Sequence, residues 1–254
     1  MAESLKRQEK IMHILRERGV ISVSELQEKL FYSESSIRRD LKALTNLGLI
    51  IHTHGKIALN RGDHYEQSVM ARSTENKQAK QKIAECASDL VKNGDTVFLD
   101  SSTTVLEMIP FLSGKSDLTI VTNGIFTLQQ AYNYILDGKF FCLGGMLRKT
   151  NGSSLTGFFT QKNLEYTHCD KMFFSARAAN TKFGISDTSE GEANIKQHML
   201  NNTTLSYFLV DSSKINKCST FLVCDINMPN KIITDSKTIL EEDWIPLSGK
   251  IMIV

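Results

Sequence analysis

The sequence lacks a long apolar run and an apolar leader. Among its 254 residues no stretch of about 18 or more consecutive apolar residues occurs, so no transmembrane helix is expected. The opening MAESLKRQEK is charged and contains none of the apolar segment that a signal peptide requires. We therefore expect neither a membrane protein nor an exported one.

Paired cysteines and motifs for cofactors are missing. The five cysteines are an odd number without a CxxC pair, which argues against a disulfide framework or a zinc ribbon and favours a reducing cytoplasm. The histidines are not spaced like a set of metal ligands. Neither a GxGxxG fingerprint nor a phosphate-binding P-loop motif occurs, so a nucleotide cofactor has no support. We expect no metal and no cofactor.

The composition is that of a soluble protein, with an uneven distribution of charge. Apolar residues make up 41% and charged residues 23%, enough for a substantial core, and the length allows two unequal domains or one large one. The net charge is +2, but residues 1–60 carry +3 and the remainder −1. This basic excess at one end is only weak evidence for a nucleic-acid partner, since many solvated helices carry as much.

Residues 1–60 have the pattern of three short helices followed by a hairpin. A first helix ends at Gly19, and its apolar residues fall on one face at helical spacing: Leu5, Ile11, Met12, Ile14 and Leu15. Ser22 and Glu25 form the S-x-x-E pattern of a capping box that starts a second helix. Ser33 is the expected N-cap of a third helix, whose buried face would consist of Ile37, Leu41, Leu44 and Leu47. Two extended runs then flank His54-Gly55, which predicts a winged helix-turn-helix domain.

The outer face of the third helix carries the residues that could contact DNA. Arginine can form paired hydrogen bonds to guanine in the major groove, lysine neutralises phosphate, and hydroxyls at a helix N-terminus let the backbone approach phosphate. The candidate DNA-binding residues, with two from the wing, are Ser35, Ser36, Arg38, Arg39, Lys42, His54 and Lys56. The alternative is a solvated basic helix in a small interaction domain.

The segment ESSIRRDLKALTNLGLIIHTHG resembles the winged helix-turn-helix signature of the DeoR family of bacterial transcriptional regulators. Residues 36–41, SIRRDL, match the family's T-I-R-R-D-L with serine in place of threonine. Lys56 stands where the family's wing has a second glycine, which adds a positive charge at the wing tip. The resemblance implies that this module binds operator DNA.

Beyond a polar linker at residues 61–76, apolar extended runs alternate with helical stretches. Strands are expected at 96–100, 118–123, 139–145, 171–176, 205–211, 231–235 and 250–254, and helices near 103–112, 125–136 and 191–202. Thr74 could cap a helix that follows it, and 221–225 could be either a strand or a loop. The pattern predicts an α/β domain at 77–254 with a mostly parallel, Rossmann-like sheet covered on both faces.

Polar residues follow several of these strands, at the edge where open α/β sheets bind ligands. Hydroxyls and free amides at the start of the helix after 96–100 would suit a phosphate, and a lysine could neutralise it. The candidate effector-binding residues are Asp100, Ser102, Thr103, Thr104, Asn123, Asp211 and Lys214. For any single loop, helix caps and turns are the better explanation of such residues, but five such loops at one edge favour a pocket.

This region also resembles the effector domain of the DeoR family, which is similar in fold to ribose-5-phosphate isomerase. The segments DSSTT, VTNG, LGG, DKMFF, DSSK and ITD match the family's recurrent segments in order, with Ser102 in place of a glycine. By this resemblance Ser102, Thr103, Thr104 and Lys214 would bind the phosphate of a sugar phosphate. Asp100, Asn123 and Asp211 would lie nearby.

The chain departs from its relatives after DKMFF. There the family has G-A-x-G and the isomerases an acidic D-G-A-D-E, whereas residues 175–179 read SARAA. No carboxylate remains there to abstract a proton from a sugar carbon, so we expect binding without turnover. Arg177 could contact the effector, or it could be an exposed loop residue. Glu190 and Glu192 are the only nearby candidates for a catalytic base.

We therefore expect a DNA-binding transcriptional regulator, a repressor of a sugar or carbohydrate operon whose operator binding responds to a phosphorylated sugar or related metabolite. Because operators are commonly symmetric, a homodimer or homotetramer is expected. The main alternative is a sugar-phosphate isomerase-like enzyme with an appended interaction domain. A third is an adaptor whose winged helix contacts protein.

Overall fold

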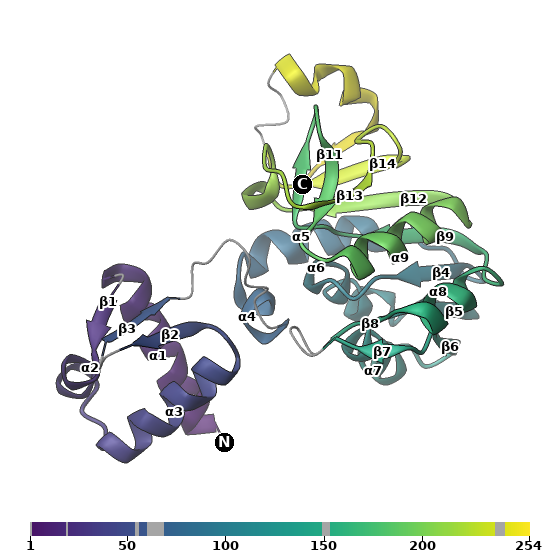
Figure 1. Cartoon of the computed structure of the whole chain (residues 1–254). Coiled ribbons are helices and arrows are strands. Elements are labelled where there is room, and N and C mark those ends of the chain that lie inside the picture. The colour runs from purple at the N-terminus through teal and green to yellow at the C-terminus, as the bar shows by residue number, and fades with distance from the viewer. Residues whose placement is uncertain (1, 19, 54–55, 60–68, 149–152, 237–241) are drawn as a thin grey trace. The chain divides into compact units, whose positions relative to one another are not determined.

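The computed structural model describes residues 2–18, 20–53, 56–59, 69–148, 153–236 and 242–254 (Figure 1). The chain divides into two compact units, Met1–Ala71 and Arg72–Val254. This division falls within the predicted linker at 61–76, part of which forms the short helix α4 (Val69–Thr74). Among the described residues, no helix combines the length and apolarity needed to cross a membrane.

The N-terminal unit has the predicted helices and hairpin. Its elements are α1 (Ala2–Arg18), β1 (Val20–Ser22), α2 (Val23–Leu30), α3 (Glu34–Asn46), β2 (Ile50–Thr53) and β3 (Lys56–Leu59). The hairpin strands β2 and β3 pair in antiparallel register. The short strand β1, which the sequence pattern did not indicate, pairs with β3 and extends the wing to three strands in the order β1-β3-β2.

The helix boundaries follow from the capping residues. Ser22 and Glu25 form the predicted capping box at the start of α2, and the Ser33 side chain accepts a hydrogen bond from the Ser36 N–H at the start of α3. Apolar side chains from all three helices and the wing form one core, which includes Ile11, Leu15, Leu26, Ile37, Leu41, Leu44, Ile50 and Ile57. Leu5, expected on the buried face of α1, is exposed.

Asp40 joins α3 to α1. Its buried carboxylate accepts hydrogen bonds from the Ser4 hydroxyl (2.6 Å) and from Arg7 and Gln8. Burial alone would raise the pKa of Asp40, but these donors and the Arg7 charge hold that pKa below its usual value. The aspartate of the SIRRDL segment therefore holds the buried face of α3 against α1 and leaves the opposite face of α3 exposed.

The second unit is built on a seven-stranded sheet in which every pair of neighbouring strands is parallel. The strands in spatial order are β15 (Ile251–Ile253), β14 (Lys231–Thr234), β12 (Thr203–Val210), β9 (Cys169–Phe174), β4 (Thr96–Leu99), β5 (Leu118–Thr122) and β6 (Gly138–Cys142). All seven predicted strands are present in it, so the predicted parallel α/β architecture is confirmed.

Helices cover both faces of this sheet. They are α5 (Lys77–Ser88), α6 (Thr103–Leu106), α7 (Ile125–Tyr134), α8 (Phe158–Leu164) and α9 (Glu190–Asn201), with 3-10 helices η1 (Ile109–Leu112), η2 (Ser212–Lys214) and η4 (Glu242–Lys250). Along β4, Val97 and Leu99 join a core that includes residues of α5 and α7, whereas Phe98 joins one that includes residues of α8 and α9. Two cores therefore sandwich the sheet, as the near-continuous apolar strands predict.

Several details differ from the sequence prediction. The helix expected over 103–112 is divided into α6 and η1. The N-cap position of α5 is Asn76 and not Thr74; Asn76 has a left-handed conformation and its side chain forms no capping hydrogen bond. The undecided segment 221–225 contains the strand β13 (Phe221–Cys224). It belongs to a second sheet, antiparallel in its pairings, with β10 (Ala178–Asn180) and β11 (Gly184–Asp187). Two very short strands, β7 (Met146–Leu147) and β8 (Leu155–Thr156), pair with each other.

The Gly144-Gly145 pair has a packing role. Both residues have positive φ, and a Cβ on Gly145 would lie 2.0 Å from the Thr160 Oγ1 of α8. The Thr160 hydroxyl donates a hydrogen bond to the Gly144 carbonyl (2.7 Å). These glycines allow the chain after β6 to approach α8 closely, which explains the LGG segment without a ligand.

Phe31 provides a test of the local structure around the turn between α2 and α3. It is the C-cap of α2 with φ of 54°, a conformation that favours glycine, and its side chain is 92% exposed. Phe31→Gly is expected to raise the free energy of unfolding of the N-terminal unit by about 0.5–1 kcal/mol, because backbone strain is relieved and almost no burial is lost. Denaturant titration measures this, with Phe31→Ala as the control that keeps the strained Cβ. A glycine variant no more stable than the alanine variant would contradict the prediction.

Candidate functional site

One face of α3 presents a polar, basic strip. Ser35, Arg38, Arg39 and Lys42 are exposed and are spaced by three or four residues, whereas Ile37, Asp40, Leu41 and Leu44 are buried on the other side. The predicted DNA-contacting residues of the helix therefore lie together on its free face. Ser36 is only half-buried.

The hydroxyls and arginines of this strip differ in how they are held. The Ser36 hydroxyl accepts a hydrogen bond from the Ser33 hydroxyl (2.9 Å) at the helix N-terminus. Arg38 forms an ion pair with Glu34, one turn earlier in α3 (2.6 Å). Among the residues that the structure describes, no ion pair involves Arg39. Arg39 is therefore the arginine whose guanidinium is available to a partner without breaking a salt bridge.

The wing contributes Lys56, which is exposed at the start of β3. His54, the other wing residue predicted to contact DNA, lies outside the described residues. The basic strip of α3 and Lys56 together form the candidate nucleic-acid interface of the N-terminal unit.

The second candidate site lies in the C-terminal unit, at the carboxyl ends of the parallel strands, and Asp100 organises it. Asp100 follows β4 and is 1% exposed. Its carboxylate accepts hydrogen bonds from the Ser102 N–H (2.9 Å) and the Ser175 N–H (3.0 Å), and its carbonyl accepts one from the Thr127 hydroxyl (3.1 Å). The Lys196 ammonium lies 3.7 Å from the same carboxylate. Asp100 thus ties together the ends of β4 and β9 and the helices α7 and α9.

Two lysines and an arginine gather on one side of Asp100. Lys214 Nζ donates to the Ser175 hydroxyl (3.1 Å), and Lys80 Nζ donates to the Thr103 hydroxyl (3.1 Å) and to the Arg72 carbonyl. Burial, together with the Lys214 charge, lowers the pKa of Lys80 to about 8, and burial lowers the pKa of Lys214 as well. We call Arg72, Lys80, Thr103 and Lys214 the cationic end of the site.

Asp211 faces this cationic end. It follows β12, and its Oδ1 accepts hydrogen bonds from the Asn76 amide (3.0 Å) and from Ser213, whereas its Oδ2 lies 3.6 Å from Lys214 Nζ. Burial alone would raise the pKa of Asp211, but the Lys214 charge and the Ser213 hydroxyl hold it below its usual value. Besides Asp211, the carboxylates of Glu75 and Asp187 act more weakly on Lys80 and Lys214, so the positive charge of the cationic end is compensated in part.

Buried polar atoms without a partner are found around the same edge. Among the residues that the structure describes, Thr104 Oγ1, Asn123 Oδ1 and Arg72 Nε form no hydrogen bond, and Thr104 and Asn123 are 0% exposed. Such atoms are costly unless something satisfies them. This pattern is what a binding site for a polar small molecule requires.

A second group of charges lies on the other side of Asp100. Lys196 Nζ is 2.5 Å from Asp187 and 4.0 Å from Glu192, and Arg148 is 3.6 Å from Glu192. Burial alone would lower the pKa of Lys196, but the surrounding carboxylates raise it. Burial raises the pKa of Glu192, and Lys196 offsets this effect only in part. We call Ser101, Arg148, Glu192 and Lys196 the acidic end. The name reflects the three carboxylates next to Lys196, which are those of Asp100, Asp187 and Glu192.

Arg177 does not belong to either group. It is exposed, and no hydrogen bond or ion pair of its side chain is found among the described residues. Its role as an effector contact stays a prediction. The other predicted effector residues come together at this edge, in agreement with the topological rule for parallel sheets.

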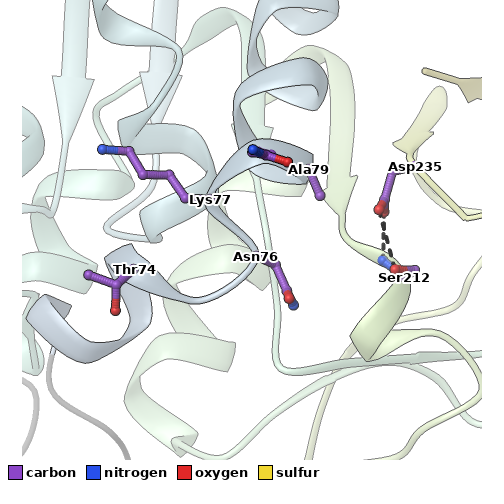
Figure 2. A pocket seen from close by; sticks show the side chains of 7 residues that line it. Thr74, Asn76, Lys77, Ala79, Ser212 and Asp235 are labelled. Carbon is purple, nitrogen blue, oxygen red and sulfur yellow. Dashed lines mark hydrogen bonds between the residues drawn. The ribbon is translucent and has the colours of Figure 1, made fainter. Parts of the chain in front are cut away.

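An open pocket of about 430 Å³ adjoins the site (Figure 2). It is lined by the start of α5 and by the loops after β12 and β14, including Asn76, Lys77, Ser212 and Asp235. Ser212 donates two hydrogen bonds to the Asp235 carboxylate from its N–H (2.7 Å) and its hydroxyl. The pocket lies next to Asp211 through Asn76 and Ser212, but the Asp100 cluster itself is buried and does not line it.

Sequence reasoning missed several polar and charged members of the site. Arg72, Asn76 and Lys80 lie before the predicted sheet. Arg148 follows β7, Asp187 ends β11 and Lys196 lies in α9, and none of the three belongs to a recognisable motif. Among them Lys80 had a usable signal: it is 4% exposed on an amphipathic helix, at helical spacing from Ile83, Ala84 and Ala87 on the same buried face. No group of histidine, cysteine and acidic residues suited to a metal is present in the described part of the chain.

These features define a class of protein: a winged helix-turn-helix domain with a basic recognition strip, joined to an α/β domain with a buried polar site. Comparison with known families agrees with this class. The DeoR-like helix-turn-helix domain matches residues 7–62, and the DeoR C terminal sensor domain matches residues 75–236. The chain belongs to the DeoR family of transcriptional regulators, as its sequence motifs predict.

Curated relatives match over nearly the whole chain. The HTH-type transcriptional regulator GolR of Listeria innocua is 32% identical over 91% of both chains. The lactose phosphotransferase system repressor of Staphylococcus epidermidis is 30% identical over 94% of this chain and 95% of its own. The transcriptional repressor AccR of Agrobacterium fabrum is 29% identical over 92% of each.

Solved structures resemble only parts of the fold. Ribose 5-phosphate isomerase A of Methanocaldococcus jannaschii is 17% identical, with a TM-score of 0.40 over 56% of this chain and 55% of the isomerase. The eIF2B beta subunit of Chaetomium thermophilum is 11% identical, with a TM-score of 0.43 over 83% of this chain and 59% of its own. Likenesses at this level carry no argument about activity.

Proposed function

We propose that the protein is a repressor of a carbohydrate-metabolism operon, which binds operator DNA through its N-terminal unit and a phosphorylated sugar or related metabolite through its C-terminal unit. The observation that carries the proposal is the buried cationic end at the carboxyl edge of the sensor domain. Relatives named as repressors, one of them of a lactose phosphotransferase system, support the assignment.

The DNA contacts are assigned to the basic strip of α3 and to the wing. Ser35 and Ser36 let the N-terminus of α3 approach phosphate, Arg39 is free to read a base edge, and Lys42 and Lys56 neutralise phosphate. Arg38 joins them once its pair with Glu34 opens, and His54 completes the predicted set. Exposed cations suit a polyanion, because binding releases the counterions of the duplex.

The effector's phosphate is assigned to the cationic end. Lys80, Lys214 and Arg72 supply positive charge, and Ser102, Thr103 and Thr104 supply hydroxyls and amides at the start of α6. The helix α6 is too short to bind an anion by its dipole alone, so the buried side-chain cations carry the argument. Asp100, Asn123 and Asp211 border the same space.

Arg72 and Lys80 suggest how binding of the effector is communicated to the DNA-binding unit. The boundary between the two units falls at Ala71 and Arg72, and within the next residues both Arg72 and Lys80 reach the cationic end. An effector bound there contacts the segment that directly follows the DNA-binding unit in the chain. The effector can shift the operator-binding equilibrium only if it binds with different affinity to the state of the protein that binds DNA and to the state that does not.

We infer a homodimer or homotetramer, because winged-helix proteins commonly read two half-sites related by symmetry. We also infer that the protein is located in the cytoplasm. Exposed aromatic side chains on the sensor domain support an oligomeric surface there. Phe158 and Phe159 of α8 are each 71% exposed, and Met146 of the neighbouring β7 is 69% exposed. Apolar surface of this kind usually marks an interaction site.

Isomerisation of a sugar phosphate is the second candidate, and Glu192 is the observation that favours it. This buried carboxylate has a raised pKa and lies beside the site, as a general base would. Lys196 and Arg148 nevertheless hold it in ion pairs. A coupled assay with pentose phosphates separates the candidates: we expect no turnover above background, and turnover abolished by Glu192→Ala would establish the enzyme.

Arg39→Ala tests the DNA contact. It is expected to weaken binding to a duplex selected from a random library by about 1–3 kcal/mol if Arg39 reads a base, because a bidentate contact is lost. Fluorescence anisotropy measures the loss on the selected duplex and on unrelated duplexes. Lys6→Ala, which removes an exposed charge from α1, is the control and should bind like the wild type. Equal losses on all duplexes would instead assign Arg39 to phosphate.

Lys214→Ala tests the effector site. Operator affinity should stay within about twofold of wild type, because Lys214 belongs to the other unit, whereas release by phosphorylated metabolites should be lost. A matched control is Lys217→Ala, since Lys217 is an exposed lysine three residues later. The measurement is operator release in an anisotropy titration with a panel of sugar phosphates. Release by the Lys214 variant at the wild-type concentration would remove Lys214 from the site.

A further inference from the structure

The turn between α2 and α3 contains an aromatic residue that contributes almost nothing to the packing of the N-terminal unit. Phe31 lies in this turn (Figure 1), and its side chain is 92% exposed. It is absent from the residues that form the core of the unit or pack against it. Among the described residues, no aromatic pair or cation–π contact includes Phe31. The fold of the unit therefore gives no reason for a large apolar side chain at this position.

The backbone of Phe31 makes the choice of residue more costly. Its φ is 54° and its ψ is 34°, a left-handed conformation that glycine and asparagine adopt with less strain. The Phe31 N–H donates to the Gln27 carbonyl (3.0 Å) at the end of α2, and this hydrogen bond needs no side chain. The strain costs stability, and the exposed ring recovers none of it through burial. A strained residue without local compensation is typical of a functional site.

The neighbours of Phe31 place it beside the first turn of α3. Tyr32 is partly buried and packs against the core, whereas Phe31 is exposed to solvent. Ser33, the N-cap of α3, follows next, and two residues of chain span at most about 7 Å. The Ser33 hydroxyl lies 3.2 Å from the Ser35 hydroxyl and donates to the Ser36 hydroxyl (2.9 Å). Phe31 is therefore an apolar group next to the serines that we assign to backbone phosphate.

The backbone of a DNA duplex offers apolar surface as well as charge. Each phosphate is esterified to two deoxyribose rings, and the carbon–hydrogen faces of these rings are apolar. A phosphate bound at the first turn of α3 therefore brings a deoxyribose close to the turn that precedes the helix. A phenyl ring that covers such a face removes apolar surface of both partners from water, which is favourable.

The exposed apolar residues of the unit favour DNA over a protein as the partner of Phe31. The other large ones among the described residues are Leu5 in α1 and Val20 and Ile51 in the wing. None of them belongs to the turn, and Val20 and Ile51 both pair with Ala58 of β3. A protein interface surrounds its anchoring residues with other contacts, which a single aromatic residue does not provide. One ring beside a helix assigned to phosphate suits the DNA backbone better.

We propose that Phe31 packs against a deoxyribose of the operator backbone, next to the phosphate bound at the N-terminus of α3. Such a contact adds affinity without reading the base sequence. Because the ring is uncharged, the contact releases no counterions and does not depend on salt as a phosphate contact does. This inference rests on the proposed binding of DNA through α3, and it adds a residue that lies outside the basic strip.

The test removes the ring in two variants of the full-length chain. Phe31→Gly and Phe31→Asn both suit the left-handed conformation, and the asparagine variant avoids the added flexibility of glycine. Fluorescence anisotropy should show binding weakened about fivefold or more by each, on the duplex selected from a random library and on unrelated duplexes alike. Phe31→Tyr keeps the ring and should stay within about twofold of the wild type. Leu5→Ala, which removes an exposed apolar side chain from α1, is the control and should bind like the wild type.

Two further measurements exclude an indirect effect through the fold or through phosphate contacts. Denaturant titration should show that Phe31→Gly is at least as stable as the wild type, because backbone strain is relieved. The slope of log affinity against log salt concentration should be unchanged in both Phe31 variants. Lys42→Ala is the comparison, since it removes a charge from the basic strip and should reduce the magnitude of this slope by about 1.

Three results would overturn the proposal. Wild-type affinity of both variants on every duplex would show that the ring does not contact DNA. A loss confined to the selected duplex would assign the ring to a base, and a reduced salt slope would show that phosphate contacts were displaced.

The outcomes also separate this inference from the function on which it rests. If the wild type binds no duplex at low salt, the proposed DNA binding itself is wrong. If Arg39→Ala or Lys42→Ala weakens binding while Phe31→Gly and Phe31→Asn bind as the wild type does, the DNA-binding strip stands and the contact of Phe31 is wrong.

Discussion

The buried carboxylate of Asp100 is the interaction on which the sensor domain depends. It receives two backbone N–H groups, from the turn after β4 and from the end of β9, and it lies beside Lys196 of α9. A buried carboxylate is tolerated only where such partners are complete. By fixing the turn at residues 100–104, Asp100 places Ser101 beside Glu192 and Thr103 beside Lys80. Both ends of the candidate site follow from this one arrangement.

The two units use positive charge in opposite ways. On α3 the arginines and lysine are exposed and solvated, which suits a long polyanion bound by neutralising successive phosphates. In the sensor domain Lys80 and Lys214 are largely buried, and burial lowers the pKa of both. Charges in such surroundings act strongly on a small anion and cost stability when none is bound. This contrast fits a protein that holds DNA along a surface and a metabolite inside a site.

Much of this arrangement could be predicted from the sequence. Helical spacing of apolar residues placed α1 and α3, near-continuous apolar runs placed all seven parallel strands, and the capping box at Ser22 placed α2. Because parallel strands end at one edge, Asp100, Asn123, Asp211 and Lys214 could be expected together. Arg72 and Lys80 could not be assigned in this way. They precede the sheet, and the contacts of this segment reach across the fold: Asn76 contacts Asp211, 135 residues later.

The sequence by itself determined the architecture, the DNA-binding helix and the polar character of the sheet edge. These features depend on residues a few positions apart, through helical periodicity, caps and the continuous apolar runs of buried strands. Only the tertiary structure decided which partner each charged group meets: Lys80 meets Thr103, Lys196 meets Asp187, and Glu192 meets Ser101. The physical reason is that the interaction energy and the pKa of a charged group depend on its burial and on neighbours from other elements. No local sequence pattern predicts either of these.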